Sequence, residues 1–429
     1  MRRRAASAAF LLGVVAALVP LVPASAEPAE QQPPDSKCTY NNTNLSRFPK
    51  SAEGEVPWPQ QRLGYTEAHK FSIGQNVRVA IIDSGVEASV GQLRGRVSAG
   101  IDVTPAVPTQ RANTDCYGHG TAVAGIVAAA PADGIGFVGV APGVRLVPIR
   151  QTWGLDVQGK TVEGRPSKLI QAMYAAVNSG ASVMNISITV PAGPLTQQTR
   201  RAFMAAVEYA RARNVVIVAA SGNADENGNQ HVLDTYPAAL AGQYDNVIAV
   251  GGIGPDGHLF SESVYGTTPW VSVVAPADQV ISTFIDKGIV GSRLQSARGT
   301  SYAAPFVTGT VALLQSRYPG ITAAEVKQRI EQTADHPATN LPDVRVGYGV
   351  VDPVAALTTV VPTGTAAASP VVAAPLPPPA TPDNGTRNAA IAAAGIGTVA
   401  AVLLVGAAVI IPRGRRRNWQ PTRRTPLEE

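Results

Sequence analysis

The chain has 429 residues, of which 45% are hydrophobic and 15% are charged, and only two cysteines. This composition excludes a disordered chain and a small disulfide-stabilised scaffold. The formal charge of +5 comes from the ends: three arginines occupy residues 2–4 and six follow residue 412, which leaves 26 basic against 28 acidic residues between the ends. We therefore expect no nucleic-acid partner.

The chain begins with a pattern typical of a secretory signal. Arg2, Arg3 and Arg4 precede an apolar run from Ala8 to Val19, and Ala24-Ser25-Ala26 fits the rule of small residues at a cleavage site. We predict a signal peptide over residues 1–26. An uncleaved amino-terminal anchor is the alternative.

Residues 27–64 are polar and rich in proline. The segment is too short for a folded inhibitory prodomain before the first strand. We expect an N-terminal extension that packs on the following domain, and a disordered terminus is the alternative.

From about residue 65 the sequence alternates β-branched runs with helical patterns. Strands are expected at 77–82, 146–150, 182–188, 215–220 and 247–250, and helices at 119–130, 167–179 and 196–213. This alternation predicts an α/β fold whose parallel sheet is covered by helices on both faces. In such a fold, functional residues gather at the carboxyl ends of the strands.

Three polar residues stand at such positions. Asp83 ends the first strand, His119 begins a helical pattern, and Ser301 begins another. Serine becomes an effective nucleophile when a histidine takes its proton, and a carboxylate fixes the histidine tautomer and stabilises its cation. The three residues are therefore the candidate catalytic set for acyl transfer.

The segments around these residues resemble the subtilisin-like serine proteases. The matching motifs are Ile-Ile-Asp-Ser-Gly-Val, His-Gly-Thr-Ala-Val-Ala-Gly and Gly-Thr-Ser-Tyr-Ala-Ala-Pro, in the order Asp83, His119, Ser301. The resemblance implies a subtilisin-like serine endopeptidase domain over residues 65–358. The catalytic set requires no metal or other cofactor. The oxygen donors Asp225, Glu226 and Asn227 indicate a solvated loop rather than a calcium site.

The same resemblance implies the rest of the site. Asn223 corresponds to the asparagine of the oxyanion hole, and Ser187, Ile188 and Gly222 to substrate-binding positions. Residues 189–191 are Thr-Val-Pro, where the family more often has Leu-Gly-Gly. This departure concerns the pocket for the substrate side chain that precedes the cleaved bond.

The C-terminal part predicts a membrane anchor. Residues 359–388 form a Pro/Ala-rich linker, with packing on the domain as the alternative. The 23 uncharged residues of 389–411 would extend about 34 Å as a helix, enough for a hydrocarbon core of about 30 Å. A buried core helix is the alternative. The basic tail, 412–429, would stay in the cytoplasm and the protease domain outside.

This arrangement resembles the mycosins, membrane-anchored subtilisin-like proteases of type VII secretion systems. Cys116, three residues before His119, is also similar to theirs. The resemblance implies cleavage of a secreted protein substrate and association with the type VII secretion membrane complex. The alternatives are a general cell-surface subtilase and a mainly structural secretion component with dispensable proteolysis.

The two cysteines, Cys38 and Cys116, both lie in the part predicted to be exported, where disulfides persist. Only one intramolecular pairing is possible. We expect a Cys38–Cys116 disulfide that ties the extension to the active-site face, and two free thiols are the alternative.

Overall fold

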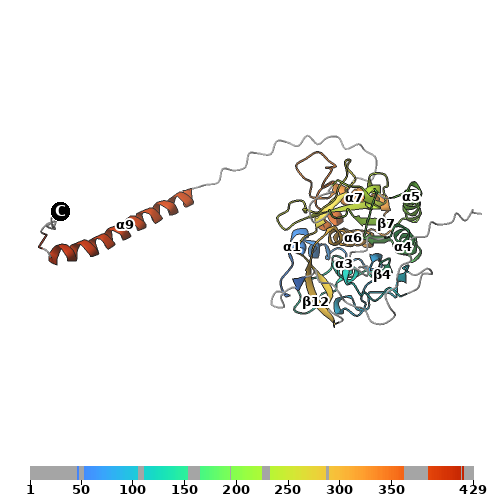
Figure 1. Ribbon diagram of the computed structural model, residues 1–429, viewed down its shortest axis with the longest axis horizontal. Helices are drawn as coiled ribbons and strands as arrows, with labels where there is room; N and C mark the ends of the chain where they lie inside the picture. The colour runs from blue at the N-terminus through green and yellow to red at the C-terminus, as the bar shows by residue number, and fades with distance from the viewer. Residues whose placement is uncertain are drawn as a thin grey trace, which may run out of the picture. The chain divides into compact units, whose positions relative to one another are not determined.

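The structure is a computed structural model that describes residues 46–47, 53–104, 111–152, 165–193, 195–224, 232–286, 289–361, 385–416 and 418–419. The chain divides into two units, Met1–Val361 and Pro362–Glu429. Figure 1 shows the elements of each. The predicted signal peptide, most of the N-terminal extension and most of the linker lie outside the described residues.

A seven-stranded sheet forms the centre of the first unit. Its order is β10-β9-β7-β5-β2-β4-β3, and all of its strand pairs are parallel. The strands are β2 (Arg78–Asp83), β3 (Ile101–Asp102), β4 (Arg145–Arg150), β5 (Val183–Ile186), β7 (Val216–Ala220), β9 (Val247–Ile253) and β10 (Val273–Pro276).

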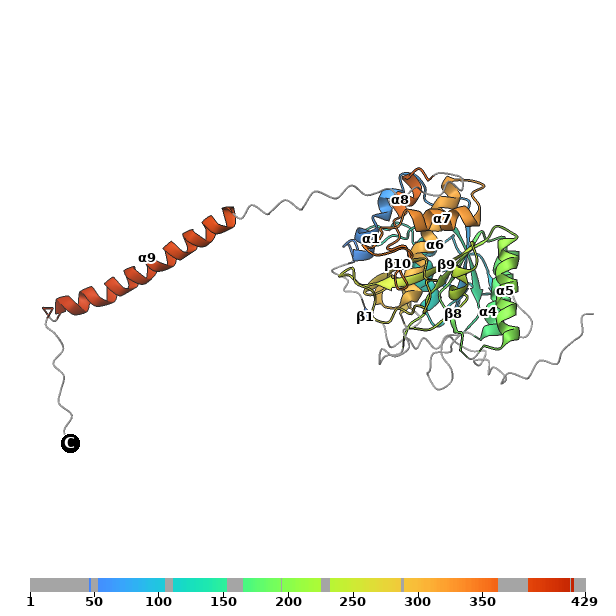
Figure 2. The ribbon, with the colours of Figure 1, turned by 90° about the horizontal axis from the view of Figure 1, so that it is seen from above.

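Helices cover both faces of this sheet. Helices α3 (His119–Ala128) and α6 (Thr300–Arg317) pack on one face, and α4 (Pro166–Asn178) and α5 (Gln197–Arg211) on the other. Figure 2 shows α4 and α5 on one side of the strands and α6 on the opposite side. Along β2, Val79 and Ile81 belong to the core beneath α3 and α6, whereas Ala80 and Ile82 face α4 and α5. The predicted α/β fold with a parallel, doubly covered sheet is confirmed.

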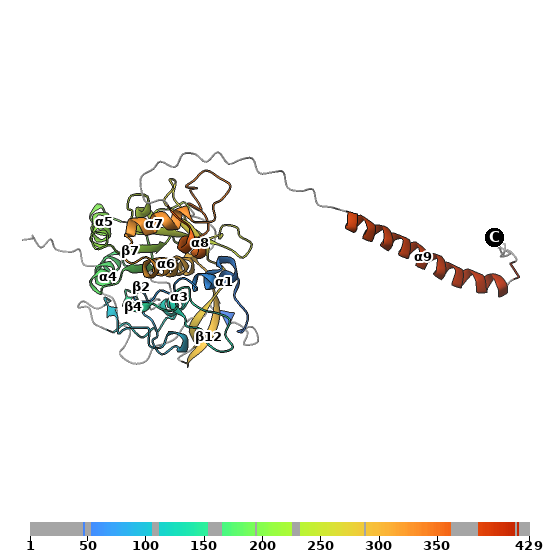
Figure 3. The ribbon, with the colours of Figure 1, turned by 180° about the vertical axis from the view of Figure 1, so that it is seen from behind.

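The smaller elements surround this core. They are β1 (Ser46–Arg47), α1 (Trp58–Leu63), α2 (Tyr65–Ala68), β6 (Val190–Pro191), β8 (Thr235–Tyr236), β11 (Val280–Asp286), β12 (Ile289–Ala297), α7 (Ala323–Gln332), α8 (Pro353–Thr358) and the 3₁₀ turns η2 (Gly91–Leu93) and η3 (Ala238–Gly242). Strands β11 and β12 form an antiparallel hairpin. Figure 3 shows β12 below α1 and α3.

The described part of the N-terminal extension lies against this hairpin. Strand β1 pairs antiparallel with β12, so that Ser46 faces Ser296. The indole N–H of Trp58 lies 3.0 Å from the carbonyl of Asp278 and 3.1 Å from that of Gln279, just before β11. The described residues of the extension therefore pack on the domain.

The second unit contains helix α9 (Gly385–Arg416), which includes the apolar run 389–411. Across the described residues, no helix meets the length and hydropathy that crossing a membrane requires. The transmembrane helix predicted for this run is thus not confirmed.

Close packing of α6 against Val140 makes one glycine a test of the fold. A Cβ built on Gly309 of α6 would lie 2.5 Å from the Cβ of Val140. We expect Gly309→Ala to lower the free energy of unfolding by about 1–3 kcal/mol, because overpacking outweighs the better helix propensity of alanine. Urea denaturation measures this change.

Gly193→Ala is the matched control, because a Cβ there would meet nothing within 4 Å. Equal stability of the two variants would contradict the proposed packing of α6.

Candidate active site

Asp83 ends β2, an interior strand of the parallel sheet. Its side chain is fully buried. Its Oδ1 accepts hydrogen bonds from the backbone N–H of Ser84 at 2.7 Å and from the Ser84 hydroxyl at 3.2 Å. Gly85 follows with φ +111°, a conformation that favours glycine. The chain therefore turns away directly after the carboxylate.

His119 begins α3 beside this carboxylate. Its Nδ1 lies 2.8 Å from Oδ1 and 3.0 Å from Oδ2 of Asp83. A Cβ on the next residue, Gly120, would lie 2.1 Å from the carbonyl oxygen of Gly85, so only glycine permits this approach. With Nδ1–H donating to Asp83, Nε2 is left as the basic nitrogen.

The surroundings of His119 raise its pKa. Burial alone would lower this pKa, but the charge and hydrogen bond of Asp83, followed by the charge of Asp115, outweigh it. The rings of Tyr302 and Tyr117 flank the imidazole, with centroids 5.1 Å and 6.3 Å away. The histidine is therefore enclosed by aromatic rings and stabilised as a cation by carboxylates.

Asp115 was missed by the sequence analysis. It is fully buried, which raises its pKa, and hydrogen bonds from Thr121 and Gly118 oppose that rise. Its Oδ2 accepts from the Thr121 N–H at 2.9 Å, and its Oδ1 accepts from the N–H groups of Gly118 at 2.9 Å and Tyr117 at 3.1 Å. Asp115 thus fixes the turn that begins α3. An acidic residue just before a helix was the available signal.

Ser301 is the second residue of α6 and is 7% exposed. Its carbonyl oxygen accepts a 2.7 Å hydrogen bond from the Ser187 hydroxyl. That hydroxyl accepts from Asn185 Nδ2 at 2.8 Å, and Asn185 Oδ1 accepts from the Thr308 hydroxyl at 2.8 Å. This buried chain joins the end of β5 to the first turns of α6, and so fixes the backbone of Ser301.

Within the described residues, no hydrogen bond joins the Ser301 hydroxyl to His119. In free enzymes the bond between nucleophile and base is often long and tightens only when substrate is bound.

Asn223 lies beyond β7, close to Gly299. A Cβ built on Gly299 would be 3.2 Å from Asn223 Nδ2 and 3.3 Å from Ser301 Oγ. Asn223 Oδ1 accepts from the N–H and hydroxyl of Thr300 at 2.9 and 3.1 Å, so its Nδ2 remains available as a donor. The N–H of Ser301, in the first turn of α6, lacks a partner within the helix. The Asn223 amide and the Ser301 hydroxyl therefore lie near the same glycine, beside the first turn of α6.

The predicted substrate-binding residues border this point. The Ser187 hydroxyl is directed to the Ser301 carbonyl, so its side chain supports the backbone of Ser301. Residues 187–189 extend beyond β5, with Ile188 and Thr189 half-buried. A Cβ on Gly222, whose φ is +103°, would lie 3.4 Å from Thr189 Oγ1. Thr189 and Gly222 therefore lie close together.

Cys116 is disulfide-bonded. The chain has one other cysteine, Cys38, which lies outside the described residues, so the Cys38–Cys116 pairing stays a prediction. The loop of Asp225, Glu226 and Asn227 also lies outside them. In the part of the chain that is described, no three His, Cys, Asp or Glu side chains gather as a metal site would require.

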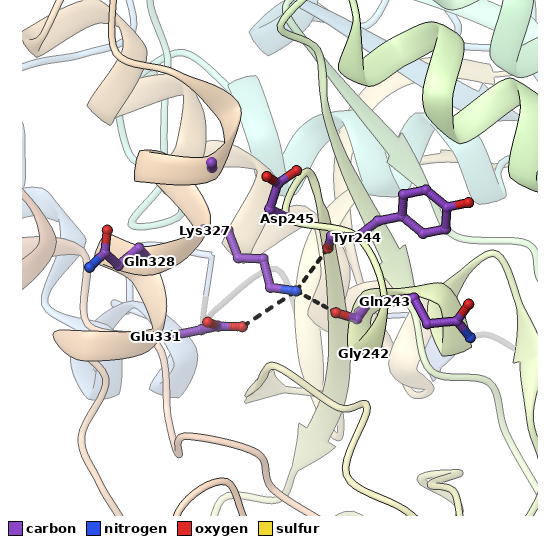
Figure 4. A pocket seen from close by; sticks show the side chains of 9 residues that line it. Gly242, Gln243, Tyr244, Asp245, Lys327, Gln328 and Glu331 are labelled. Carbon is purple, nitrogen blue, oxygen red and sulfur yellow. Dashed lines mark hydrogen bonds and ion pairs between the residues drawn. The ribbon is translucent and has the colours of Figure 1, made fainter. Parts of the chain in front are cut away.

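A pocket of about 300 Å³ lies elsewhere, between α7 and the turn before β9. Figure 4 shows Lys327 directed into it. The ammonium donates to the carbonyls of Ala241 and Tyr244 and lies 3.8 Å from Glu331. Burial lowers the pKa of Lys327 and raises that of Glu331. These bonds tie α7 to η3 and the turn before β9 and give the lysine a structural role.

A buried Asp–His pair, a serine at a helix N-terminus and an asparagine amide near that serine on a parallel α/β fold define a subtilisin-like serine peptidase. The chain belongs to the subtilase family, whose profile matches residues 74–349, and is a serine endopeptidase.

Within this family the chain is of the mycosin type. It is 34% identical to Mycosin-1 of Mycobacterium tuberculosis, over 95% of this chain and 99% of that protein. The crystal structure of MycP1 from Mycobacterium smegmatis is 32% identical, with a TM-score of 0.61, and covers 75% of this chain and 89% of its own. A chain in the periplasmic assembly of the ESX-5 inner membrane complex is 31% identical, with a TM-score of 0.64, covering 81% and 94%.

The raised pKa of His119 predicts the pH dependence of catalysis. Protonated His119 cannot accept a proton, so kcat/KM should fall as the pH drops through this pKa. Because the carboxylates raise the pKa from its ordinary 6.5, the midpoint of the acid limb should lie above pH 6.5. Peptide hydrolysis measured across pH gives the midpoint.

Asp245→Asn is the control, since Asp245 forms an exposed ion pair with Arg211 and should leave the limb unchanged. A wild-type midpoint at or below 6.5 would show that burial dominates.

Proposed function

We propose that the protein hydrolyses peptide bonds with Ser301 as nucleophile, His119 as general base and Asp83 as the group that orients His119. The observation that carries this proposal is the pair of distances, 2.8 and 3.0 Å, from His119 Nδ1 to the Asp83 carboxylate. It is supported by the position of Ser301 at the start of α6.

The reaction follows from these roles. Ser301 Oγ attacks the carbonyl carbon while His119 Nε2 takes the hydroxyl proton, and the carbonyl electrons move to the oxygen. As the tetrahedral intermediate collapses, the C–N bond breaks and His119 returns the proton to the leaving amine. Water then attacks the acyl-enzyme in the same way, with His119 again as base, and releases the acid.

The negative oxygen of the intermediate is stabilised by Asn223 Nδ2 and the Ser301 N–H. Thr300 holds the Asn223 carbonyl oxygen, which orients its amide before substrate arrives. Losing one such donor lowers kcat by about 10²–10³-fold, a magnitude measured on a subtilisin.

The substrate is an extended peptide that lies along residues 187–189. Backbone pairing supplies affinity, and side-chain pockets supply preference. Thr189 lies near Gly222, and residues 189–191 are Thr-Val-Pro where the family pattern more often has Leu-Gly-Gly. The pocket for the side chain before the cleaved bond therefore differs in shape from that of the family.

The physiological substrate is a protein exported by a type VII secretion system, and the enzyme associates with that system's membrane complex. Support comes from relatives: one solved neighbour belongs to the periplasmic assembly, and another to the intact inner membrane complex, of ESX-5. The second covers 86% of this chain at 31% identity.

The enzyme acts outside the cytoplasmic membrane and is held there by its C-terminal segment. The support is the sequence: a signal pattern over 1–26, an uncharged apolar run over 389–411, and arginines directly after it. The Pro/Ala-rich linker keeps the protease domain away from the bilayer.

A Cys38–Cys116 disulfide holds the N-terminal extension across the active-site face. In the chain-entropy model, closing the loop between Cys38 and Cys116 stabilises the folded state by about 4–5 kcal/mol. The extension stays attached as a structural strap.

A substitution of Ser301, the proposed nucleophile, tests the catalytic role without removing the protein. Ser301→Ala in the purified full-length chain should lower kcat by about 10⁶-fold, the loss known for the nucleophile of a subtilisin, with an unchanged melting temperature. Ser98→Ala, an exposed serine, is the matched control. Wild-type hydrolysis by the Ser301 variant would contradict the catalytic assignment.

In a deletion strain, the same variant reports the cellular role through separate assays of substrate processing and secretion. We expect processing to be lost. Secretion that persists with Ser301→Ala but fails without the protein would show a second, structural role. Substrate processing that persists with Ser301→Ala would contradict the protease role.

Topology has its own test. Protease added to spheroplasts should release the catalytic domain by cutting within 359–387, while a tag placed after Glu429 stays protected. Digestion of that tag from outside would refute a single span with a cytoplasmic tail.

A further inference from the structure

Arg150 is a buried cation beside the proposed catalytic aspartate. It ends β4, which pairs with β2 so that Arg150 faces Asp83 across the sheet. Its side chain is 3% exposed. An unpaired charge at such a site is costly, so its partners indicate what it holds.

All three nitrogens of the guanidinium donate to named acceptors. Nε donates to the Ser84 carbonyl at 3.1 Å, and Nη1 to Asp102 Oδ2 at 2.7 Å and the Arg111 carbonyl at 3.2 Å. Nη2 donates to the Thr114 carbonyl and, at 3.0 Å, to its hydroxyl. Among the described residues alone, Arg150 thus donates five hydrogen bonds from its side chain.

The acceptors belong to the two segments that carry the Asp83–His119 pair. Ser84 directly follows Asp83, and Thr114 begins the turn that reaches His119. A Cβ built on Gly85 would lie 2.2 Å from the Thr114 carbonyl oxygen and 3.1 Å from Arg150 Nη2. The guanidinium therefore bonds both turns, beside the point where Gly85 approaches Thr114.

Farther from the site, backbone bonds from Val86 to Ala112 and from Ala88 to Asn113 join the same segments. Loss of Arg150 would thus loosen the end nearest the site while the outer end stays joined. Asp102, the ion-pair partner of Arg150, is itself held in place. Its other oxygen accepts hydrogen bonds from the N–H and hydroxyl of Thr104 at 3.0 and 2.6 Å.

We propose that the Asp102–Arg150 ion pair is a positioning unit that sets the distance between Asp83 and His119. This inference rests on the proposed function. Buried ion pairs add little net stability compared with well-packed apolar residues, whereas a displacement of about 1 Å in a catalytic group can lower the rate about 10²-fold. The benefit of the pair therefore lies in geometry.

The test compares Arg150→Met with the double variant Arg150→Met/Asp102→Leu in the full-length chain. The single change leaves Asp102 buried without its partner, so the melting temperature should fall; the double change removes both charges and should recover much of it. We expect both variants to lose about 10²-fold in kcat, with KM little changed. Arg150→Lys should not rescue kcat, because an ammonium lacks the planar fork that reaches both turns.

The pH profile gives a second readout. The groups that face His119 are Asp83 from β2, Asp115 and Tyr117 from the turn before α3, and Tyr302 from α6. If the variants lengthen the bond to Asp83, the midpoint of the acid limb should move down, towards lower pH. Arg211→Met, which breaks an exposed ion pair, should change neither kcat nor the midpoint.

The outcomes are distinct. A double variant that regains stability and kcat together, with a wild-type acid limb, would overturn the positioning role and leave the proposed function intact. Wild-type hydrolysis that survives Ser301→Ala would refute the proposed function and this inference with it. Low kcat and a shifted limb in a stable double variant would support it.

Discussion

The site depends on a carboxylate buried at the end of a parallel strand. Asp83 has no exposure to water, and an isolated charge there would be strongly disfavoured. Donors from Ser84 and His119 compensate for the lost water. They can do so only because Gly85 and Gly120 lack side chains where the two turns meet. Close backbone contact is thus the condition for a buried carboxyl group beside the imidazole.

Separate polar networks hold the two halves of the site. On the α3 side, Asp115 binds the turn before His119, and Arg150 joins that turn to the residue after Asp83. On the α6 side, Asn185 and Ser187 connect β5 to the carbonyl of Ser301. Buried networks with satisfied partners favour a single arrangement, which suits a reaction that needs its groups aligned before substrate binds.

Much of the fold was predictable because the signals are local. Apolar β-branched runs gave the interior strands within a few residues, and glycine-flanked motifs marked Asp83, His119 and Ser301 at element ends. The supporting residues were not predictable in this way. Arg150 and Asn185 act through partners distant in sequence, such as Thr308 for Asn185. A single sequence contains the residues of such a pair but no signal that they meet.

The same limit applies to the Ser187 side chain. Its position after β5 suggested contact with substrate, yet its hydroxyl donates to the Ser301 carbonyl. Polarity and place in the motif do not determine side-chain direction. That direction follows from the packing of α6 against the end of β5, which is a tertiary contact.

The N-terminal extension reaches the site through the β11–β12 hairpin. Trp58 bonds the turn before β11, and β1 extends the sheet at β12. On β11, the hydroxyls of Ser282 and Thr283 donate to the carbonyls of Ala122 and Thr121 in α3, and α3 begins with His119. The extension thus supports the hairpin, and the hairpin supports the histidine helix. Removing the segment would expose β12 as a sheet edge and weaken the support that the hairpin gives to α3.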